Sequence, residues 1–421
     1  MLKVIFIFAF IAIVVNAKVR YDNYTLFKIL PKDVEQIKLL QSLQFNEDKY
    51  DFWTDPIPNA EFVNILSNPS GRLELESFLR QNGIKFEIPQ PNIQEAIDNQ
   101  VVTGYNRNSG RSLTLNEYHD LDAIYSWLEE LAATYDSVTL LIGGRSHEGR
   151  DIKGIKISHG SGKKAIFLEG GIHAREWISP ATLIYVTNEL LTSSNEEIQA
   201  AAHDFDWYIF PVTNPDGYVF TIVNNRMWRK NRRQFGADYG VDLNRNWNSN
   251  WLVAGASTNP SSNTYAGPGP FSEAESRTLS EFLGTIGHDI EMYLSFHSYG
   301  RLLLIPYGNS TEPYANYHDA LNIGRRAMGA LSVRYGTLYT TGNVAEAIYL
   351  ATGSSTDWAK DHLKVPLVYC YELRDNGQYG FALPPDQIIP NSEETMDSIL
   401  DLIHQARRFG YLKSQGNGVR A

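Results

Sequence analysis

The sequence contains almost no cysteine: Cys370 is the only one among 421 residues. An intramolecular disulfide is therefore excluded, and the fold must be held by its hydrophobic core. Val365 to Tyr371 is an apolar run typical of a buried strand, in which cysteine is usually an inert small side chain. A catalytic thiol is thus a poor explanation of this residue, and no Gly-x-Ser-x-Gly motif supports a serine nucleophile.

Positive charge is also scarce, since 37 Lys and Arg residues face 48 Asp and Glu residues and the net charge is −11. No basic cluster of the nucleic-acid-binding type occurs, so we expect no nucleic acid partner. The densest basic run is Arg226 to Arg233. It is compatible with a solvated face, but Trp228 and a nearby Asn-Arg pair favour a cleft that binds carboxylates.

Long hydrophobic runs are absent except at the start, where Val4 to Val15 follow the basic residue Lys3. At about 1.5 Å per residue, a helix of this run is much shorter than a ~30 Å hydrocarbon core. Small residues follow at Val15-Asn16-Ala17, so residues 1–17 are predicted to be a cleaved signal peptide. We therefore expect a secreted, extracellular protein without a membrane partner.

Residues 22–89 show the order strand, helix, strand, strand, helix, strand, which predicts a small ferredoxin-like α+β domain. The expected strands are Tyr24–Leu30, Tyr50–Trp53, Glu61–Leu66 and Ile84–Ile88, and the helices are Pro31–Leu43 and Gly71–Gln81. A connecting helix is expected from Asn92 to Val101. The polar stretch 105–112 then contains Arg107 and Arg111 and has the composition of a proteolytic site, although an ordinary linker is the alternative.

Residues 112–421 alternate strand-like and helix-like runs, which predicts a mixed, mostly parallel sheet with helices on both faces. A hairpin is expected to open the domain, and His147 and His159 are interpreted as solvated turn residues. A capping box at Ser272–Glu275 predicts the start of a helix that runs to about Gly284. The last helix is expected from about Glu393 to Arg408, before Gly410. Further expected strands are Ser137–Gly143, Asp151–His159 and Trp207–Val212.

The first candidate for chemistry is a pair of metal-ligand types, His173 and Glu176, directly after the apolar run Ala165 to Leu168. Imidazole and carboxylate are both good zinc ligands. The pair Gly170-Gly171 allows a sharp turn after the strand, and Ser179-Pro180 resemble the start of a helix. This position is the carboxyl end of a strand, where open α/β sheets bind ligands. Metal binding and a structural ion pair both remain possible at this point.

His297 is the best candidate for a third ligand, because it ends the strand-like run that begins at Ile290. A single histidine on such a run is more often a satisfied core residue. The following loop Ser298-Tyr299-Gly300 nevertheless places the imidazole at the carboxyl edge of the sheet. Two histidines and one glutamate form a ligand set found in zinc peptidases.

Six sequence blocks, in order, resemble the zinc metallocarboxypeptidases of the pancreatic A/B type in their proenzyme form. The blocks are Gly171–Ile178, Pro211–Tyr218, Asn225–Arg232, Gly240–Trp247, Ser295–Tyr299 and Tyr371–Asp375. The resemblance runs from about Leu115 to the carboxyl end. It implies the carboxypeptidase fold with an eight-stranded sheet, an inhibitory propeptide at 18–111 and a catalytic domain at 112–421. It also implies activation after Arg107 or Arg111 by a trypsin-like protease.

The resemblance further implies a role for each matching residue. One Zn²⁺ would be bound by His173, Glu176 and His297, with Glu372 as the general base and Arg229 stabilising the oxyanion. The substrate would be bound by Asn244, Arg245 and Tyr349 at its terminal carboxylate, by Arg175, Ser298 and Tyr299 further along, and by Thr356 at the floor of the specificity pocket. Without the resemblance, Glu372 is interpreted as a surface acid paired with Arg374, and Tyr349 as a packed aromatic.

The pocket floor differs from both types in the family, which have Asp for basic and Ile for neutral terminal residues. Thr356 is uncharged, as are Val344, Ala351 and Cys370 at other pocket positions, so nothing offsets the cost of burying a cation. We expect an A-like preference for aromatic or aliphatic ends in a monomeric, digestive carboxypeptidase acting on peptides and proteins. The alternatives are a B-type or polar preference, and a non-catalytic binding module. Asn23 and Asn309 begin glycosylation sequons.

Overall fold

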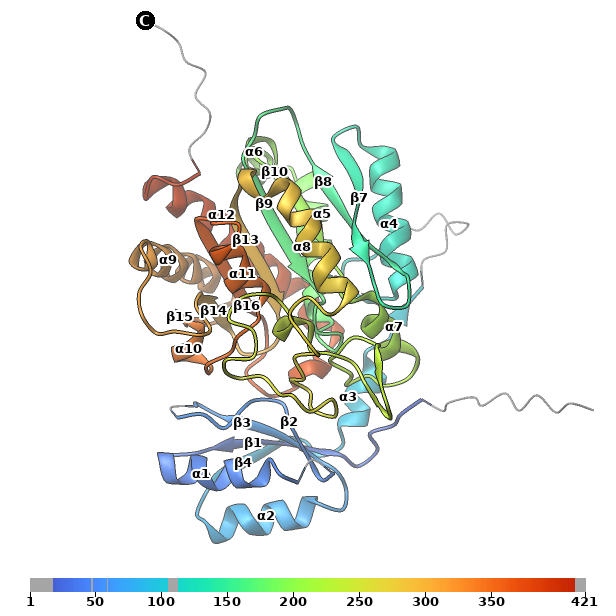
Figure 1. Ribbon diagram of the computed structural model, residues 1–421, viewed down its shortest axis with the longest axis vertical. Coiled ribbons are helices and arrows are strands. Elements are labelled where there is room, and N and C mark those ends of the chain that lie inside the picture. Colours follow the sequence, from blue (N-terminus) through green and yellow to red (C-terminus); the bar gives the residue numbers. More distant parts are fainter. Residues whose placement is uncertain (1–17, 47, 59, 105–112, 413–421) are drawn as a thin grey trace, which may run out of the picture.

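The computed structural model describes residues 18–46, 48–58, 60–104 and 113–412. A small domain lies at the bottom of Figure 1, in blue, and a larger domain lies above it. The predicted signal peptide and both candidate activation arginines, Arg107 and Arg111, fall outside the described residues. Within the described part of the chain, no helix has the length and hydrophobicity needed to cross a membrane.

The small domain has the predicted order of elements, with boundaries that differ by up to three residues. They are β1 (Thr25–Leu30), α1 (Val34–Leu43), β2 (Tyr50–Phe52), β3 (Val63–Ser67), α2 (Arg72–Gln81) and β4 (Lys85–Gln90). The strands form an antiparallel sheet in the order β2-β3-β1-β4. Both helices lie on the face of the sheet that points away from the larger domain (Figure 1). The connecting helix is α3 (Ile93–Asn99), as expected.

An eight-stranded mixed sheet forms the centre of the larger domain, which confirms the predicted fold class. Its order is β15-β14-β16-β13-β9-β10-β8-β7, and the neighbouring strands β16, β13, β9 and β10 are all parallel. The predicted hairpin forms from β7 and β8, but it does not open the domain, because the unpredicted helix α4 (Leu121–Thr134) precedes it. The strands are β7 (Val138–Arg145), β8 (Asp151–Ile157), β9 (Ala165–Gly170), β10 (Asp206–Phe210), β13 (Ile290–His297), β14 (Leu302–Ile305), β15 (Thr340–Asn343) and β16 (Leu367–Glu372).

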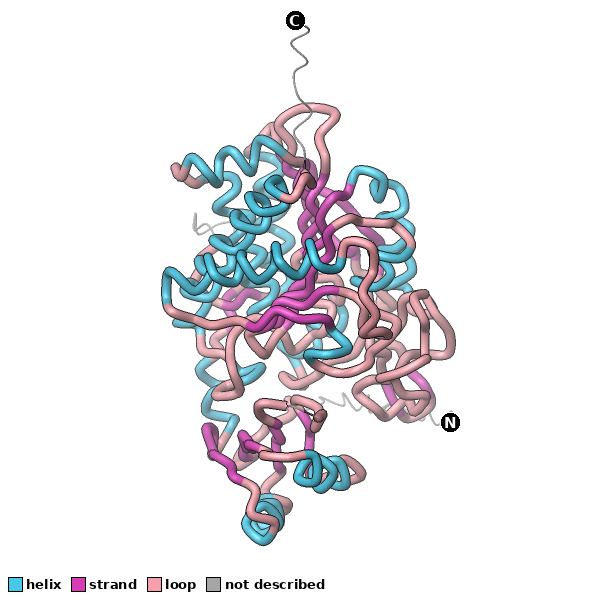
Figure 2. Tube along the Cα trace, turned by 90° about the vertical axis from the view of Figure 1, so that its left-hand side faces the viewer, coloured by secondary structure: helices cyan, strands magenta, loops and turns pink. Residues whose placement is uncertain are grey.

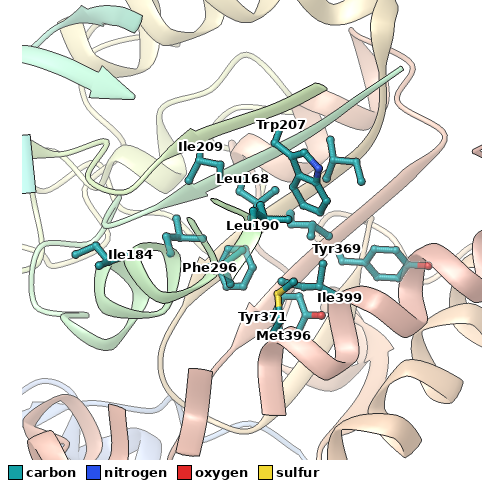
Figure 3. Close-up of a cluster of buried hydrophobic side chains, with 14 of the residues drawn as sticks. Leu168, Ile184, Leu190, Trp207, Ile209, Phe296, Tyr369, Tyr371, Met396 and Ile399 are labelled. Carbon is teal, nitrogen blue, oxygen red and sulfur yellow. The ribbon is translucent and has the colours of Figure 1, made fainter. Parts of the chain in front are cut away.

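Helices cover both faces of this sheet, as the side view in Figure 2 shows. Alternate residues of β9 serve the two faces: Ile166 and Leu168 belong to one buried cluster, and Ala165 and Phe167 to the other. Figure 3 shows the first cluster around Leu168. It is closed by α4 (Leu121–Thr134), α5 (Ile178–Thr192), α6 (Glu196–Asp204), α9 (Tyr317–Tyr335) and α12 (Ile388–Arg408), whereas α8 (Ala274–Ile286) and α11 (Ser355–Asp361) close the second.

Three predicted helix starts were wrong. α8 begins at Ala274 without a side-chain cap, because the Ser272 hydroxyl oxygen accepts from Asn246 Nδ2 at 2.9 Å instead. α5 begins at Ile178, and the Ser179 hydroxyl inside it donates to Phe296 O on β13. α12 begins at Ile388, five residues earlier than expected, because Pro390 falls in the first turn, where no backbone donor is needed. Both serines that the local sequence suggested as helix caps thus form tertiary hydrogen bonds instead.

Candidate active site

The parallel strands β9, β13 and β16 end at the same edge of the sheet, and the site is built there. Cα pairing places Phe296 beside Gly170 and His297 beside Glu372. Segments that are far apart in the sequence therefore bring their side chains to one place. Ligand sites in open α/β sheets lie at this carboxyl edge.

A sharp turn after β9 aims the first pair of candidate ligands into the site. Gly171 has φ of 64°, a conformation that side chains disfavour, and a Cβ there would lie 3.1 Å from Pro211 O. The turn is also held by Asn214, whose Nδ2 donates to Ile172 O at 3.1 Å. His173 and Glu176 follow directly, so the glycine was correctly read as a turn residue.

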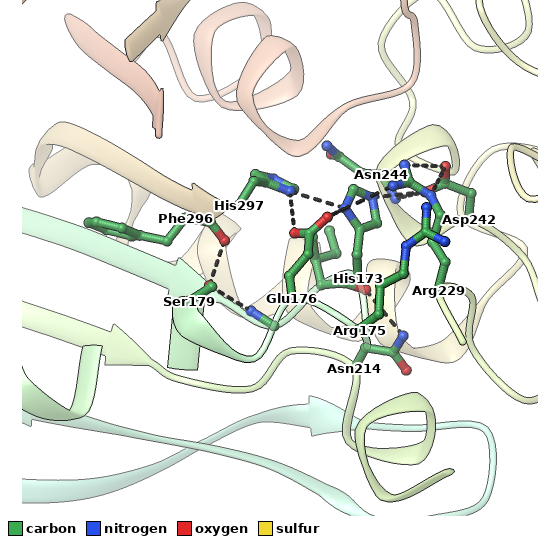
Figure 4. A network of polar contacts seen from close by, with 12 residues as sticks. His173, Arg175, Glu176, Ser179, Asn214, Arg229, Asp242, Asn244, Phe296 and His297 are labelled. Atoms are coloured by element: carbon green, nitrogen blue, oxygen red, sulfur yellow. Dashed lines mark hydrogen bonds and ion pairs between the residues drawn. The ribbon is translucent and has the colours of Figure 1, made fainter. Parts of the chain in front are cut away.

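The three predicted metal ligands form one compact, buried group (Figure 4). Nδ1 of His173 lies 2.7 Å from Glu176 Oε1, and Nδ1 of His297 lies 3.1 Å from Glu176 Oε2 and 3.1 Å from Nδ1 of His173. Burial lowers the pKa of His173 and so favours the neutral form that a ligand needs. Burial alone would raise the pKa of Glu176, but the two histidines hold it well below its ordinary value. Two imidazole nitrogens and a carboxylate at this spacing fit Zn²⁺.

Asp242 forms a hydrogen bond with the metal group. It was not among the site residues predicted from the sequence. His173 donates from Nε2 to Asp242 Oδ1 at 3.2 Å, which leaves Nδ1 free to bind a metal. Asp242 Oδ2 also accepts from Arg229, at 2.8 Å from Nη2 and 3.1 Å from Nε. One carboxylate therefore orients both a ligand and the predicted oxyanion partner. The sequence feature that could have identified Asp242 is its position two residues before the predicted site residue Asn244.

All the predicted site residues except Arg175 line a single cleft. Those that do are His173, Glu176, Arg229, Asn244, Arg245, His297, Ser298, Tyr299, Tyr349, Thr356 and Glu372. Arg175 lies beside the cleft, where its guanidinium stacks on Phe381 with 4.0 Å to the ring centroid. The basic run from Arg226 is not a solvated face, since Arg226 and Lys230 are buried.

Glu372 is half-buried at the end of β16, beside His297. Burial raises the pKa of its carboxyl group, which makes it a better proton acceptor than an exposed glutamate. It has no ion pair with Arg374 among the described residues, because Arg374 donates from Nε to Glu394 Oε1 at 2.7 Å. The interpretation of Glu372 as a surface acid is therefore wrong.

The three residues predicted to bind a terminal carboxylate meet in the cleft. Arg245 donates from Nη2 to the Tyr349 hydroxyl at 2.7 Å and from Nη1 to Asn244 O at 2.9 Å. The side-chain oxygen of Asn244 accepts from Ser355 N at 3.0 Å, which leaves its amide nitrogen as a donor. Tyr349 is thus a polar neighbour of Arg245 rather than only a packed aromatic.

The predicted specificity-pocket residues that line the cleft are all uncharged. Thr356 is buried there, and its Oγ1 lies 3.2 Å from Ser354 Oγ. The predicted wall residues Val344, Ala351 and Cys370 also line it. The nearest acid in sequence, Asp357, uses its carboxylate to accept from Gly308 N at 2.9 Å and does not line the cleft.

Comparison with known proteins agrees with this geometry. Residues 124–398 match the family model described as zinc carboxypeptidase, and residues 27–100 match the model described as carboxypeptidase activation peptide. The chain belongs to the zinc carboxypeptidase family. It is therefore a zinc-dependent hydrolase made with an activation peptide, as the resemblance implied.

Several named relatives cover most of this carboxypeptidase. Zinc carboxypeptidase A 1 of Anopheles gambiae is 41% identical over 396 residues, which cover 93% of this chain and 92% of the relative. Carboxypeptidase B of Astacus astacus is 41% identical over 287 residues, covering 67% and 94%. The crystal structure of carboxypeptidase A from Helicoverpa armigera superposes with a TM-score of 0.81 at 29% identity, covering 94% and 100%.

The activation peptide closes the cleft of this carboxypeptidase. Trp53, Asp55 and Phe62 of the small domain line the cleft together with the metal group. Asn64 accepts at Oδ1 from the Tyr299 hydroxyl at 3.0 Å, and Asp51 Oδ2 lies 3.7 Å from Arg175 Nη1. These small-domain residues were not singled out in the sequence, because they matter only once the domains are docked.

Proposed function

We propose that this carboxypeptidase is a secreted proenzyme that, once cut, removes neutral aromatic or aliphatic residues from the carboxyl end of peptides and proteins. The observation that carries the proposal is the uncharged character of Thr356 and of the other predicted pocket residues that line the cleft. A terminal Lys or Arg would lose its hydration there without gaining an opposite charge. The alternative B-type preference needs such a charge in the pocket.

We assign one Zn²⁺ per chain to His173, Glu176 and His297, an assignment that their donor atoms and spacing support. When bound, zinc supplies a Lewis acid that polarises a carbonyl and acidifies water. Asp242 holds His173 in the orientation that presents Nδ1. The same support fixes Arg229, whose Nη1 lies 3.9 Å from Glu176 Oε1.

Glu372 and Arg229 are proposed as the catalytic residues. Glu372 takes a proton from the attacking water at its carboxylate and later transfers it to the leaving amine. Its raised pKa and its place beside His297 support this role. Arg229 supplies a fixed positive charge for the oxyanion, and its ion pair with Asp242 keeps the guanidinium oriented before substrate binds.

The substrate is proposed to lie along the cleft with its terminal carboxylate on Arg245, Asn244 and Tyr349. A planar guanidinium suits a carboxylate, and the hydrogen bond between Arg245 and Tyr349 keeps the two side chains together. Further along, Arg175, Ser298 and Tyr299 bind the preceding residues. Ser298 Oγ is buried without a hydrogen-bond partner among the described residues, so it is available to a peptide.

The wider context is proposed from the sequence. Residues 1–17 direct secretion, a trypsin-like protease cuts after Arg107 or Arg111, and the enzyme acts as a monomer in digestion, in a gut lumen. Neither nucleic acid nor membrane is expected as a partner. The presence of an activation peptide supports proteolytic activation. The named relatives include both carboxypeptidase A and carboxypeptidase B, so the names do not decide the preference.

A substrate panel on the trypsin-treated protein tests the proposal. Blocked dipeptides ending in Phe, Leu, Lys or Arg are compared by kcat/KM, with and without a strong chelator. We expect Phe and Leu to be released faster, and activity to disappear with the chelator and return with zinc. Faster release of Arg would make the enzyme B-type, and the assignment of the pocket would be wrong.

A further inference from the structure

A carboxyl group is buried in the middle of the large sheet. Glu169 belongs to the central strand β9 and has no solvent exposure. Among the described residues its hydrogen-bond donors are two hydroxyl groups, Ser295 Oγ at 3.0 Å and Ser355 Oγ at 2.5 Å from Oε1, and Oε2 has no partner. Burial of a carboxyl group in a sheet is unfavourable unless hydrogen bonds or an opposite charge compensate it. An apolar residue would suit this strand better, so the carboxyl group requires a functional explanation.

The register of the sheet connects Glu169 to the metal group. Glu169 stands opposite Ser295 on β13, and His297 follows two residues later on the same face. Ser295 Oγ also lies 3.1 Å from His297 Nε2. Because His297 points Nδ1 at Glu176, Nε2 is left to donate to Ser295, whose own proton goes to Glu169. A chain of hydrogen bonds therefore leads from the buried carboxylate to the ligand.

The other histidine has the same kind of support in a shorter form. His173 donates from Nε2 directly to Asp242 Oδ1 at 3.2 Å. Both candidate ligands are thus backed by a carboxylate, one directly and one through a hydroxyl. Such outer partners fix the ring orientation and strengthen metal binding.

A second arm leads from Glu169 to the substrate side of the cleft. Ser355 begins α11, donates from its hydroxyl to Glu169 Oε1, and donates from its backbone N to Asn244 Oδ1 at 3.0 Å. This contact orients the Asn244 amide so that its nitrogen faces away from Ser355. One carboxylate oxygen is therefore shared by the metal side and the carboxylate-binding side.

We propose that Glu169 is a positioning residue with two targets. Through Ser295 it holds His297 in place for the metal, and through Ser355 it holds Asn244 in place for the terminal carboxylate of the substrate. The inference rests on the proposed roles of His297 and Asn244. It predicts that the two arms can be weakened separately, because each has its own serine.

Zinc affinity of the uncut full chain, measured by competition with a chelator, tests the metal arm. We expect Ser295→Ala to weaken zinc binding by about 10- to 100-fold, the usual effect of losing an outer partner, and Ser295→Thr to restore it. Glu169→Gln keeps an acceptor oxygen but loses the charge, so we expect it also to weaken binding. The double variant should be no weaker than the weaker single one. Ser280→Ala is the control, since that buried hydroxyl donates to Arg277 O within its own helix.

Kinetics of the trypsin-treated protein test the substrate arm. We expect Ser355→Ala to raise KM about 10-fold, as loss of one hydrogen bond of about 1.4 kcal/mol would, with zinc affinity unchanged. Unchanged zinc affinity in Ser295→Ala, or equal effects of Glu169→Gln with and without Ser295, would overturn the proposal. An unchanged KM in Ser355→Ala would remove the second target. His297→Ala distinguishes failure of this inference from failure of the proposed function. Zinc binding that survives His297→Ala would contradict the assignment of His297 as a ligand.

Discussion

The two domains differ in where they keep their buried polar groups. The small domain has an apolar core of its own around Phe27, Leu40 and Leu79, and its buried Asn64 faces the other domain. The large domain instead buries carboxylates such as Glu176 and Asp242 at the edge of its sheet. The difference indicates that the small domain folds around an apolar core and covers the cleft. The large domain buries charged side chains at the site where the chemistry takes place.

The contact between the domains is formed by a separate apolar cluster with residues from both. Trp53 of the small domain packs on Phe381 of the large one with 5.0 Å between ring centroids, and Met227 and Tyr299 belong to the same cluster. Apolar packing thus supplies the attraction, while Asn64 and Asp51 contact residues of the cleft. The small domain covers the site without contributing to either core of the large domain, so the two parts are separable in principle.

The largest expected effect comes from removing the proposed base of the large domain. We expect Glu372→Gln to lower kcat of the cut enzyme by about 10²- to 10⁴-fold, because only the proton transfer is lost. Zinc and substrate affinity should stay unchanged. Steady-state kinetics and chelator competition measure the two. Glu291→Gln, at the opposite end of β13 and paired with Lys164, is the matched control. Substantial activity in Glu372→Gln would remove Glu372 from the mechanism.

The next largest effect concerns the small domain, which covers the cleft. We expect the uncut chain to be nearly inactive and Trp53→Ala to raise its activity by up to about 100-fold, since loss of a buried Trp costs about 3 kcal/mol or more at the interface. Activity before and after trypsin treatment measures this. Phe45→Ala, an exposed aromatic of the same domain, should change nothing. An uncut chain as active as the cut one would show that the small domain is no inhibitor.

A smaller effect is expected at the pocket floor, which belongs to the large domain alone. Thr356→Asp should shift the preference of the cut enzyme toward terminal Lys and Arg by about 10- to 100-fold, because a hydrogen bond to a charged group contributes about 1.5–3 kcal/mol. The ratio of kcat/KM for substrates ending in Arg and Phe measures the shift. Thr356→Val keeps the floor neutral and should keep the original order. No shift in Thr356→Asp would place the floor elsewhere.

The smallest effect on activity should follow from damage to the small-domain core. Leu79 has no exposure there, and Leu79→Ala should destabilise the small domain by about 2–5 kcal/mol. Denaturation of the uncut chain measures the loss, while kcat/KM of the cut enzyme should be unchanged. A cut enzyme impaired to the same degree would mean that the two domains are not separable.

The sequence by itself determined much of this protein, because periodic patterns and motifs are local. The element order of the small domain and the central strands of the large sheet followed from the pattern of apolar residues, whereas helices such as α4 and α9 were not predicted. All but one of the predicted site residues line the cleft. The motif blocks gave the ligand types, and the resemblance gave their roles. The fold class and the metal group were therefore predictable without coordinates.

Only the tertiary structure decided the partners of these residues. Three contacts join segments that are distant in sequence or lie on separate strands. They are the hydrogen bond of Asp242 to His173, the bridge that Ser295 forms between Glu169 and His297, and the packing of the small domain over the cleft. Which residue stands opposite another depends on strand register, and Ser179 shows the same effect, since its hydroxyl bonds to β13 rather than capping α5. The residue type determines whether a side chain can donate or accept a hydrogen bond. The packing of distant segments determines which residue is its partner.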